Sequence, residues 1–166
     1  MIRPRPLLAR RTVLVGLPAL CMAACASAEP KKTPLRFVVQ ADQSINPDAQ
    51  GNPFPVVLRI YELKQSTAFT QLAFFELLDA DASKLGPDLV AKRELELKPG
   101  DTKSFDRETP LETRYIGVIA GFRSLDNAQW RAVGEVKPDK GNQIVIKVTA
   151  FSVNLDSKAD KTLGLF

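Results

Sequence analysis

Short segments in which apolar and polar residues alternate recur along this chain, and they constrain its fold more than any other feature. Alternation with a period of two places the apolar side chains on one face of a β-strand. Strands are predicted at residues 35–41, 56–63, 95–98, 104–106, 115–123, 130–136 and 144–154. A short helix begins at a cap, Ser66 or Thr67, and runs to about Leu78, and a second short, irregular turn or helix is predicted at 85–90. Because strands and helices do not alternate, the pattern predicts a mainly β protein, a two-layer β-sandwich with a short helical insertion.

Two turn signals are expected between neighbouring strands, and the first of them is expected to form a hairpin. Pro99-Gly100 separates 95–98 from 104–106, and the turn at 138–141 separates 130–136 from 144–154. Gly117 and Gly121 share one strand face, which indicates a closely packed neighbour or a bulge. The predicted sandwich domain spans 35–155, and a C-terminal tail, 156–166, follows it with an apolar end that either docks or is free.

The chain has no histidine and two cysteines, which removes most familiar catalytic chemistry. Past Cys25 it lacks the residues for Cys/His zinc sites, Cys-His nucleophiles and Ser-His-Asp triads. Nucleotide-loop and hydrolase motifs are also missing. We therefore predict no enzyme activity, no cofactor and no metal. Two alternatives remain, a carboxylate-only hydrolase and a calcium site at 79–83, where a solvated turn is the expectation.

The N-terminal segment has the features of a secretory leader. Arginines precede a short apolar run at 13–20, which is shorter than the roughly 20 apolar residues of a membrane-spanning helix. Met22-Ala23-Ala24-Cys25 resembles a bacterial lipobox, whose cysteine is acylated after cleavage. We expect a lipoprotein signal peptide at 1–24, lipidation at Cys25 and a lipidated tether at 25–34. The alternatives are acylation at Cys21 and an ordinary cleavage site at 26–28.

Removal of this leader changes what the charge implies. All four leader arginines precede Cys25, so the formal charge of +4 falls to 19 basic against 19 acidic residues. A neutral domain gives no reason to expect nucleic-acid binding. Because Ala26, not aspartate, follows the lipobox cysteine, the resemblance implies delivery to the outer membrane. Arg10-Arg11 partly matches a twin-arginine export signal, so the export route stays open.

A loop rich in turn residues, 43–55, separates the first two predicted strands. Its three prolines stiffen the backbone and remove hydrogen-bond donors. Phe54 lies between two of them. Its side chain either packs into the core as a plug that anchors the loop, or is exposed for contact with a partner. The plug is the expectation.

The chain resembles the outer-membrane lipoprotein family of the type VI secretion system (TssJ). The resemblance is carried by segments in the family's order, at 46–48, 51–64, 74–75, 85–89, 97–100, 116–120, 122–123 and 130–131, together with the lipobox. No single segment is specific, whereas the ordered set is. Ser124 departs from the pattern, because an acid is expected after the Phe122-Arg123 pair.

The resemblance implies a transthyretin-like β-sandwich tethered to the outer membrane and facing the periplasm. Such a protein is non-catalytic and holds the C-terminal periplasmic domain of the inner-membrane subunit TssM in an envelope-spanning complex. In the family, the loop between the first two strands contributes to that contact. It corresponds here to Asn46, Pro47, Asp48, Gly51, Phe54 and Pro55. The alternative for these residues is loop architecture alone.

The alternative function is a transthyretin-like periplasmic lipoprotein that binds carbohydrate or a small apolar molecule. It would need exposed aromatic side chains, for which Tyr61, Tyr115, Trp130 and some of the phenylalanines are candidates. Strand alternation places most of them in the core, which favours the assembly function.

Overall fold

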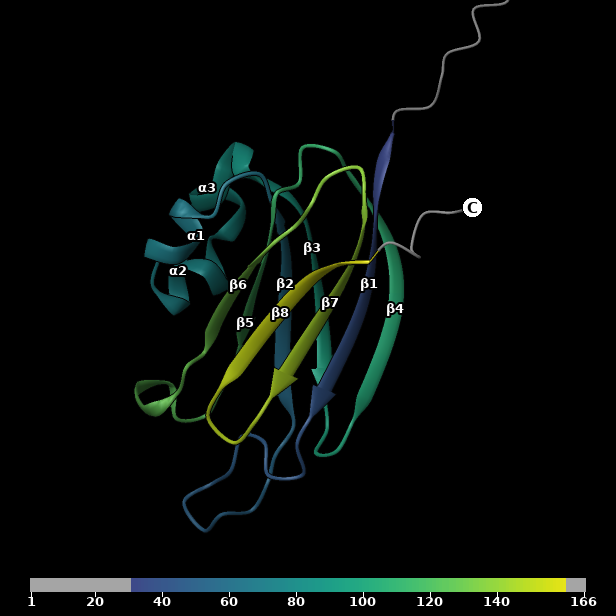
Figure 1. The fold of residues 1–166 in the computed structure, drawn as a ribbon. Coiled ribbons are helices and arrows are strands. Elements are labelled where there is room, and N and C mark those ends of the chain that lie inside the picture. Colours follow the sequence, from purple (N-terminus) through teal and green to yellow (C-terminus); the bar gives the residue numbers. More distant parts are fainter. Residues whose placement is uncertain (1–30, 161–166) are drawn as a thin grey trace, which may run out of the picture.

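The computed structural model describes residues 31–160. The predicted signal peptide, Cys25 and the ends of the predicted tether and tail lie outside the described residues. The chain forms two four-stranded sheets that pack face to face (Figure 1). This is the predicted two-layer, mainly β architecture, with eight strands in place of the predicted seven.

The first sheet has the strand order β4-β1-β7-β8. Its strands are β1 (Lys32–Ala41), β4 (Thr102–Pro110), β7 (Gly141–Val148) and β8 (Val153–Asp160). β1 pairs antiparallel with β4 and parallel with β7, and β8 is antiparallel to β7. The N-terminal strand therefore lies inside the sheet, hydrogen-bonded on both sides.

The second sheet has the order β3-β2-β5-β6 and is antiparallel throughout. Its strands are β2 (Val56–Leu63), β3 (Leu89–Leu97), β5 (Tyr115–Ala120) and β6 (Arg131–Glu135). The predicted strands at 56–63 and 115–123 are its two central members, as their high apolar content requires.

The core between the sheets consists of the inward-facing members of the alternating pattern. Residues two apart on β1, β2, β5 and β7 are buried together: Leu35, Phe37, Val39, Leu58, Ile60, Ile116, Val118, Ile144 and Ile146. Each such side chain contributes roughly 1.5–3 kcal/mol on burial. Glu62 also faces inward, and it is satisfied across the sheets by Arg107 and by the hydroxyl of Thr109 at 2.6 Å.

Three short helices cover part of the outer face of the second sheet (Figure 1). They are α1 (Thr67–Gln71), α2 (Phe74–Asp79) and α3 (Asp81–Leu85), followed by the 3₁₀ turn η1 (Gly86–Asp88). Phe69 and Leu77 are fully buried in a second apolar cluster, against Tyr61 and Ile119. None of the helices within residues 31–160 is long and apolar enough to cross a membrane.

The prediction of one helix to about Leu78 is wrong, because the chain becomes extended at Leu72 (ψ 144°). Arg131 stabilises the break by donating hydrogen bonds to the carbonyls of Phe69 and Leu72, at 2.9 and 2.8 Å. The backbone N–H of Ala73 then donates to Glu76 at 3.0 Å, which begins α2. Carbonyls that a continuous helix would use are therefore bonded to a side chain from β6.

The hairpin predicted at Pro99-Gly100 does not form, whereas the turn predicted at 138–141 does lie between two strands, β6 and β7. β3 and β4 lie in different sheets, and so do β6 and β7. The Pro99-Gly100 turn packs instead on the end of β1, with the N–H of Gly100 donating to Asp42 and that of Ala41 to Asp101, at 3.2 and 2.8 Å. The true hairpin, β7–β8, replaces the single predicted strand at 144–154.

The sandwich extends beyond both predicted bounds, 35 and 155. β1 begins at Lys32, within the predicted tether, and β8 continues to Asp160, within the predicted tail. Lys32 to Pro34 pair with the end of β4, and Asp156 to Asp160 pair with β7. Backbone pairing in the sheet therefore orders residues whose side chains carry little strand signal.

Candidate partner-binding surface

Three loops meet at one end of the sandwich, opposite the end at which β1 begins (Figure 1). They are the β1–β2 loop, the β5–β6 connection with its 3₁₀ turn η2 (Leu125–Asn127), and the β7–β8 turn. We call this end the loop pole. A hollow of about 550 Å³ lies between the loops, lined among others by Pro47, Arg123 and Phe151.

Asn46 fastens the β1–β2 loop to the body of the domain. Its side chain is buried, with Nδ2 donating to the carbonyl of Pro55 and Oδ1 accepting from the N–H of Arg123, both at 2.7 Å. Its φ of 49° lies in the left-handed region, which asparagine tolerates better than most residues. Asn46 is therefore an internal brace between the start of β2 and the β5–β6 connection.

Asp48 organises the tip of the same loop. One carboxylate oxygen accepts from the N–H groups of Gln50 and Asn52, at 2.9 and 2.8 Å, and the other accepts from the Asn52 side chain at 3.0 Å. The hydrogen bond from the Asn52 side chain is the largest cause that lowers the pKa of Asp48. Gly51 completes the turn with a φ of 85°, a conformation that favours glycine.

Phe54 is not the predicted plug. Its side chain is 37% exposed, and the buried anchor of the loop is Ile45, which accepts a backbone hydrogen bond from Phe54 at 3.2 Å. The guanidinium of Arg123 lies 4.6 Å from the centre of the Phe54 ring. This cation–π contact holds the ring at the surface.

The structure thus places the six predicted residues in one loop but divides them by role. Asn46, Asp48 and Gly51 set the loop conformation, as the alternative of loop architecture requires. Pro47 is half-buried, whereas Phe54 and Pro55 are exposed and available to a partner.

Sequence reasoning missed several exposed side chains near this loop. Val57 and Phe151 are each 44% exposed and Phe75 is 62% exposed, although all three are large and apolar. Phe75 could have been found, because adjacent helical residues cannot both face the core and Phe74 is the buried one. Nothing in the local pattern marks Val57 or Phe151.

The prediction of a solvated turn at 79–83 is wrong, because the carboxylate of Asp81 in this segment is buried and ion-paired. Asp81 is buried at the start of α3 and accepts from Lys92 at 2.8 Å to both oxygens and from Arg59 at 3.2 Å. Burial raises the pKa of Asp81, but the bonds from Lys92 and Ala82 and the charge of Arg59 leave that pKa below its ordinary value. Among residues 31–160 no group of three or more potential ligands could hold a metal ion.

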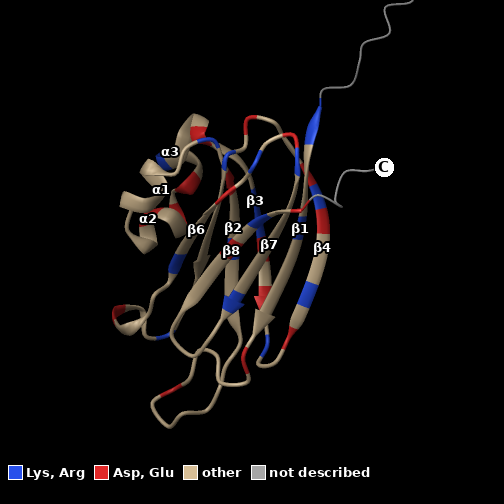
Figure 2. Ribbon diagram, in the orientation of Figure 1, with Lys and Arg blue, Asp and Glu red and all other residues tan. Residues whose placement is uncertain are grey.

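Of the three tyrosine and tryptophan residues named as candidates for a small-ligand site, Tyr61 is buried, and Tyr115 and Trp130 are half-buried. Tyr61 is fully buried, and Trp130 packs edge-on against Phe74 with ring centres 5.3 Å apart and beneath the guanidinium of Arg131. Figure 2 shows acidic and basic residues interspersed along β4, whereas the charged residues of β1 are basic. Ser124, the departure from the family pattern, accepts a hydrogen bond from Asn127 at 2.9 Å inside the β5–β6 connection.

Comparison with known proteins gives a consistent result. Residues 33–151 match the family model described as type VI secretion lipoprotein, VasD, EvfM, TssJ. A search of curated proteins found no significant match.

Solved structures are similar over nearly their whole length. The crystal structure of the T6SS lipoprotein TssJ1 from Pseudomonas aeruginosa is 34% identical, with a TM-score of 0.74, over 77% of this chain and 98% of that one. Serratia marcescens Lip, a membrane-bound component of the type VI secretion system, is 27% identical with a TM-score of 0.68, over 74% and 96%. A chain in the structure of the T6SS protein TssM C-terminal domain from EAEC is 31% identical with a TM-score of 0.61, over 74% and 99%.

Proposed function

Since this chain belongs to the type VI secretion lipoprotein family, we propose that it is a non-catalytic, lipid-anchored outer-membrane subunit that holds the C-terminal periplasmic domain of TssM. Chains in the structures of a type VI membrane complex and of a TssM C-terminal domain are similar to this one. The observation that carries the proposal is the position of the loop pole, at the opposite end of the sandwich from the start of β1.

Acylation of Cys25 would bring the start of β1 close to the membrane. Seven peptide units separate Cys25 from Lys32, and a fully extended chain of that length spans about 25 Å at most. Three acyl chains supply far more apolar burial than the single chain that binds only marginally. The tethered end of the domain would therefore face the outer membrane.

The loop pole would then face the periplasm. β1 has ten residues, which at about 3.3 Å each separate its two ends by roughly 30 Å. The β1–β2 loop follows its far end directly, so it is presented to a subunit that approaches from the inner membrane.

The loop is also preorganised for binding. The bonds of Asn46 and Asp48 hold its backbone in place before a partner arrives. A partner consequently loses less affinity to the ordering of this segment than it would with a flexible loop.

The experiment tests anchoring and binding separately. The full-length lipoprotein, extracted in detergent from the source bacterium, is used to capture the purified C-terminal periplasmic domain of TssM. Replacing residues 46–55 with a Gly/Ser linker is expected to abolish capture while the sandwich stays folded. Capture that survives the replacement would move the interface away from the loop, and no capture by the unmodified protein would refute the proposal.

For anchoring, Cys25→Ser is expected to release the protein from outer-membrane fractions. Cys21→Ser is the matched control and should leave it there. Retention of the Cys25→Ser protein in outer membranes would overturn the assignment of the anchor.

A further inference from the structure

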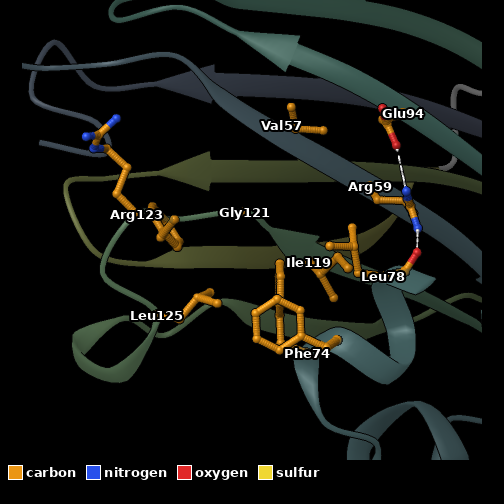
Figure 3. A pocket seen from close by; sticks show the side chains of 11 residues that line it. Val57, Arg59, Phe74, Leu78, Glu94, Ile119, Gly121, Arg123 and Leu125 are labelled. Atoms are coloured by element: carbon orange, nitrogen blue, oxygen red, sulfur yellow. Dashed lines mark hydrogen bonds and ion pairs between the residues drawn. The ribbon is translucent and has the colours of Figure 1, made fainter. Parts of the chain in front are cut away.

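An open groove of about 590 Å³ crosses the outer face of the second sheet, between α2 and the β5–β6 connection. Figure 3 shows Phe74, Ile119 and Leu125 along it, with Arg123 at one end and the Arg59–Glu94 pair at the other. The helices cover another part of this face and leave the groove open.

The floor of the groove is apolar and only partly covered. Val57 on β2 is 44% exposed and Phe75 on α2 is 62% exposed, and both line the groove. Gly121 adds no side chain to fill it, although a Cβ at this position would be in ordinary contact at 3.6 Å. Exposed apolar surface framed by polar residues is typical of a binding site.

The charges at the two ends of the groove are not equivalent. Arg59 is neutralised by Asp81 at 3.2 Å and by Glu94 at 2.9 Å. The exposed Arg123 forms no ion pair within 4.0 Å among residues 31–160. Its guanidinium lies on the Phe54 ring, and its charge is one of the causes that lower the pKa of Asp48. The groove therefore combines an apolar floor with one positive charge that is not held in a direct ion pair.

We propose that this groove binds an amphipathic segment of a partner protein, in which apolar side chains lie beside a carboxylate. The apolar side chains would occupy the floor formed by Val57 and Phe75, and the carboxylate would pair with the Arg123 guanidinium. An arginine fork binds a carboxylate through two parallel hydrogen bonds, which fixes the register of the segment.

This inference rests on the proposed function and gives the TssM domain a second contact. Arg123 lines both the groove and the hollow at the loop pole, so the two surfaces are continuous. A membrane lipid offers similar chemistry, an anionic head and an apolar chain. The groove opens beside the loop pole, at the end of the sandwich away from β1's first residue, which favours a protein segment.

The test compares variants of the full-length lipoprotein in detergent, with the purified C-terminal periplasmic domain of TssM as the probe. Val57→Asp, Phe75→Ser and Arg123→Glu each alter one side of the proposed contact. Val145→Asp and Lys147→Glu make matched changes on the outer face of the first sheet. Circular dichroism and thermal melting establish that all five proteins are folded.

Each groove variant is expected to raise the Kd roughly 30-fold, as loss of a central contact does, whereas the controls stay within about twofold. Binding by Arg123→Glu should recover when one acidic residue of the probe is changed to lysine. Such a recovery would identify the paired carboxylate.

Other outcomes would overturn the inference. If the three variants bind normally while the loop replacement abolishes binding, the groove is not used and the proposed function stands. If the unmodified protein does not bind, both fail. If the unmodified protein binds dihexanoylphosphatidylglycerol, and Val57→Asp abolishes this binding while the affinity for the TssM probe is unchanged, the occupant of the groove is a lipid. If the unmodified protein self-associates, and the groove variants lose this self-association while their affinity for the TssM probe is unchanged, the occupant of the groove is a second copy of the chain.

Discussion

Gly117 is the residue at which the close approach predicted from the sequence is most evident. A Cβ built on it would lie 2.7 Å from two carbons of the Phe69 ring, which is fully buried beneath α1. The ring cannot retreat without disturbing the second apolar cluster. Gly117→Ala is expected to lower the free energy of unfolding by about 1–3 kcal/mol, the usual cost of overpacking, measured by urea denaturation.

Gly121→Ala is the matched control, because the nearest atom to its Cβ would be 3.6 Å away. It should change stability little. Adding Phe69→Leu to Gly117→Ala should cost less than the two single changes together, since the smaller side chain relieves the clash. Additive effects would show that the ring and the glycine are not coupled.

Asn46 supports a second prediction at this scale. Asn46→Ala leaves the Pro55 carbonyl and the Arg123 N–H without their partner and places alanine at a φ of 49°. The expected loss is about 3 kcal/mol, from two hydrogen bonds and the left-handed backbone. Thermal melting measures it, and Gln50→Ala, which removes an exposed side chain from the same loop, is the control. Equal stability of the two variants would contradict the bracing role.

Residue roles were predictable only where the cause is local. Gly117 stands in a strand and has no side chain, so a close neighbour could be expected before its identity was known. Asn46 and Asp48 were grouped with Phe54 by their position in the loop. Their bonds depend on where Pro55, Arg123 and Asn52 lie in space, and a turn-rich sequence does not contain that information.

Among the contacts between secondary-structure elements, Tyr61 of β2 attaches helix α2 to the second sheet. Its hydroxyl donates to the Leu77 carbonyl at 3.0 Å, and burial raises the pKa of Tyr61 to about 12. Tyr61→Phe is expected to cost about 1 kcal/mol at neutral pH, the net value of one hydrogen bond.

The same substitution has an alkaline signature. The unfolded phenol ionises near pH 10, whereas the folded one stays protonated to about pH 12, so the unfolded state binds fewer protons in this window. The contribution that this pKa shift of Tyr61 makes to the free energy of unfolding is fully present below pH 10 and is lost as the pH rises towards 12. Denaturation at pH 8 and pH 11 should show a shallower alkaline loss for Tyr61→Phe than for the unmodified protein. Parallel losses would exclude Tyr61 as a cause.

Elements were predicted better than their pairing. Alternation located most strands because it records burial, but it does not name the neighbouring strand. Pro99-Gly100 does form a turn, and the strands on its two sides pair with β2 and β1 in separate sheets. The part of β8 beyond residue 155 was not predicted, because Ser157 and Ala159 occupy the positions at which a strand pattern has large apolar residues. The absence of a side chain at Gly134 of β6 makes room for Leu155 of β8, a contact that the sequence pattern does not reveal.

At the scale of the whole molecule, the direction of β1 would link the proposed membrane anchor to the candidate binding surface. Because β1 is hydrogen-bonded on both sides, its two ends are held rigidly apart. A tether attached to its first residue and a binding loop attached to its last residue cannot exchange places. If Cys25 is acylated as proposed, the sandwich would act as a spacer with the start of its first strand towards the membrane.

This arrangement predicts unequal distances from the membrane for two exposed positions. Gln50 lies in the loop pole, and Lys140 precedes β7 at the end where β1 begins. Single cysteines, Gln50→Cys and Lys140→Cys, can carry a fluorophore in the lipidated protein reconstituted into vesicles with brominated lipid. Quenching should be strong at position 140 and weak at position 50, because β1 separates the two ends by roughly 30 Å. Equal quenching would show that the sandwich lies flat on the membrane, which would leave the loop pole and the groove unable to face a partner from the inner membrane.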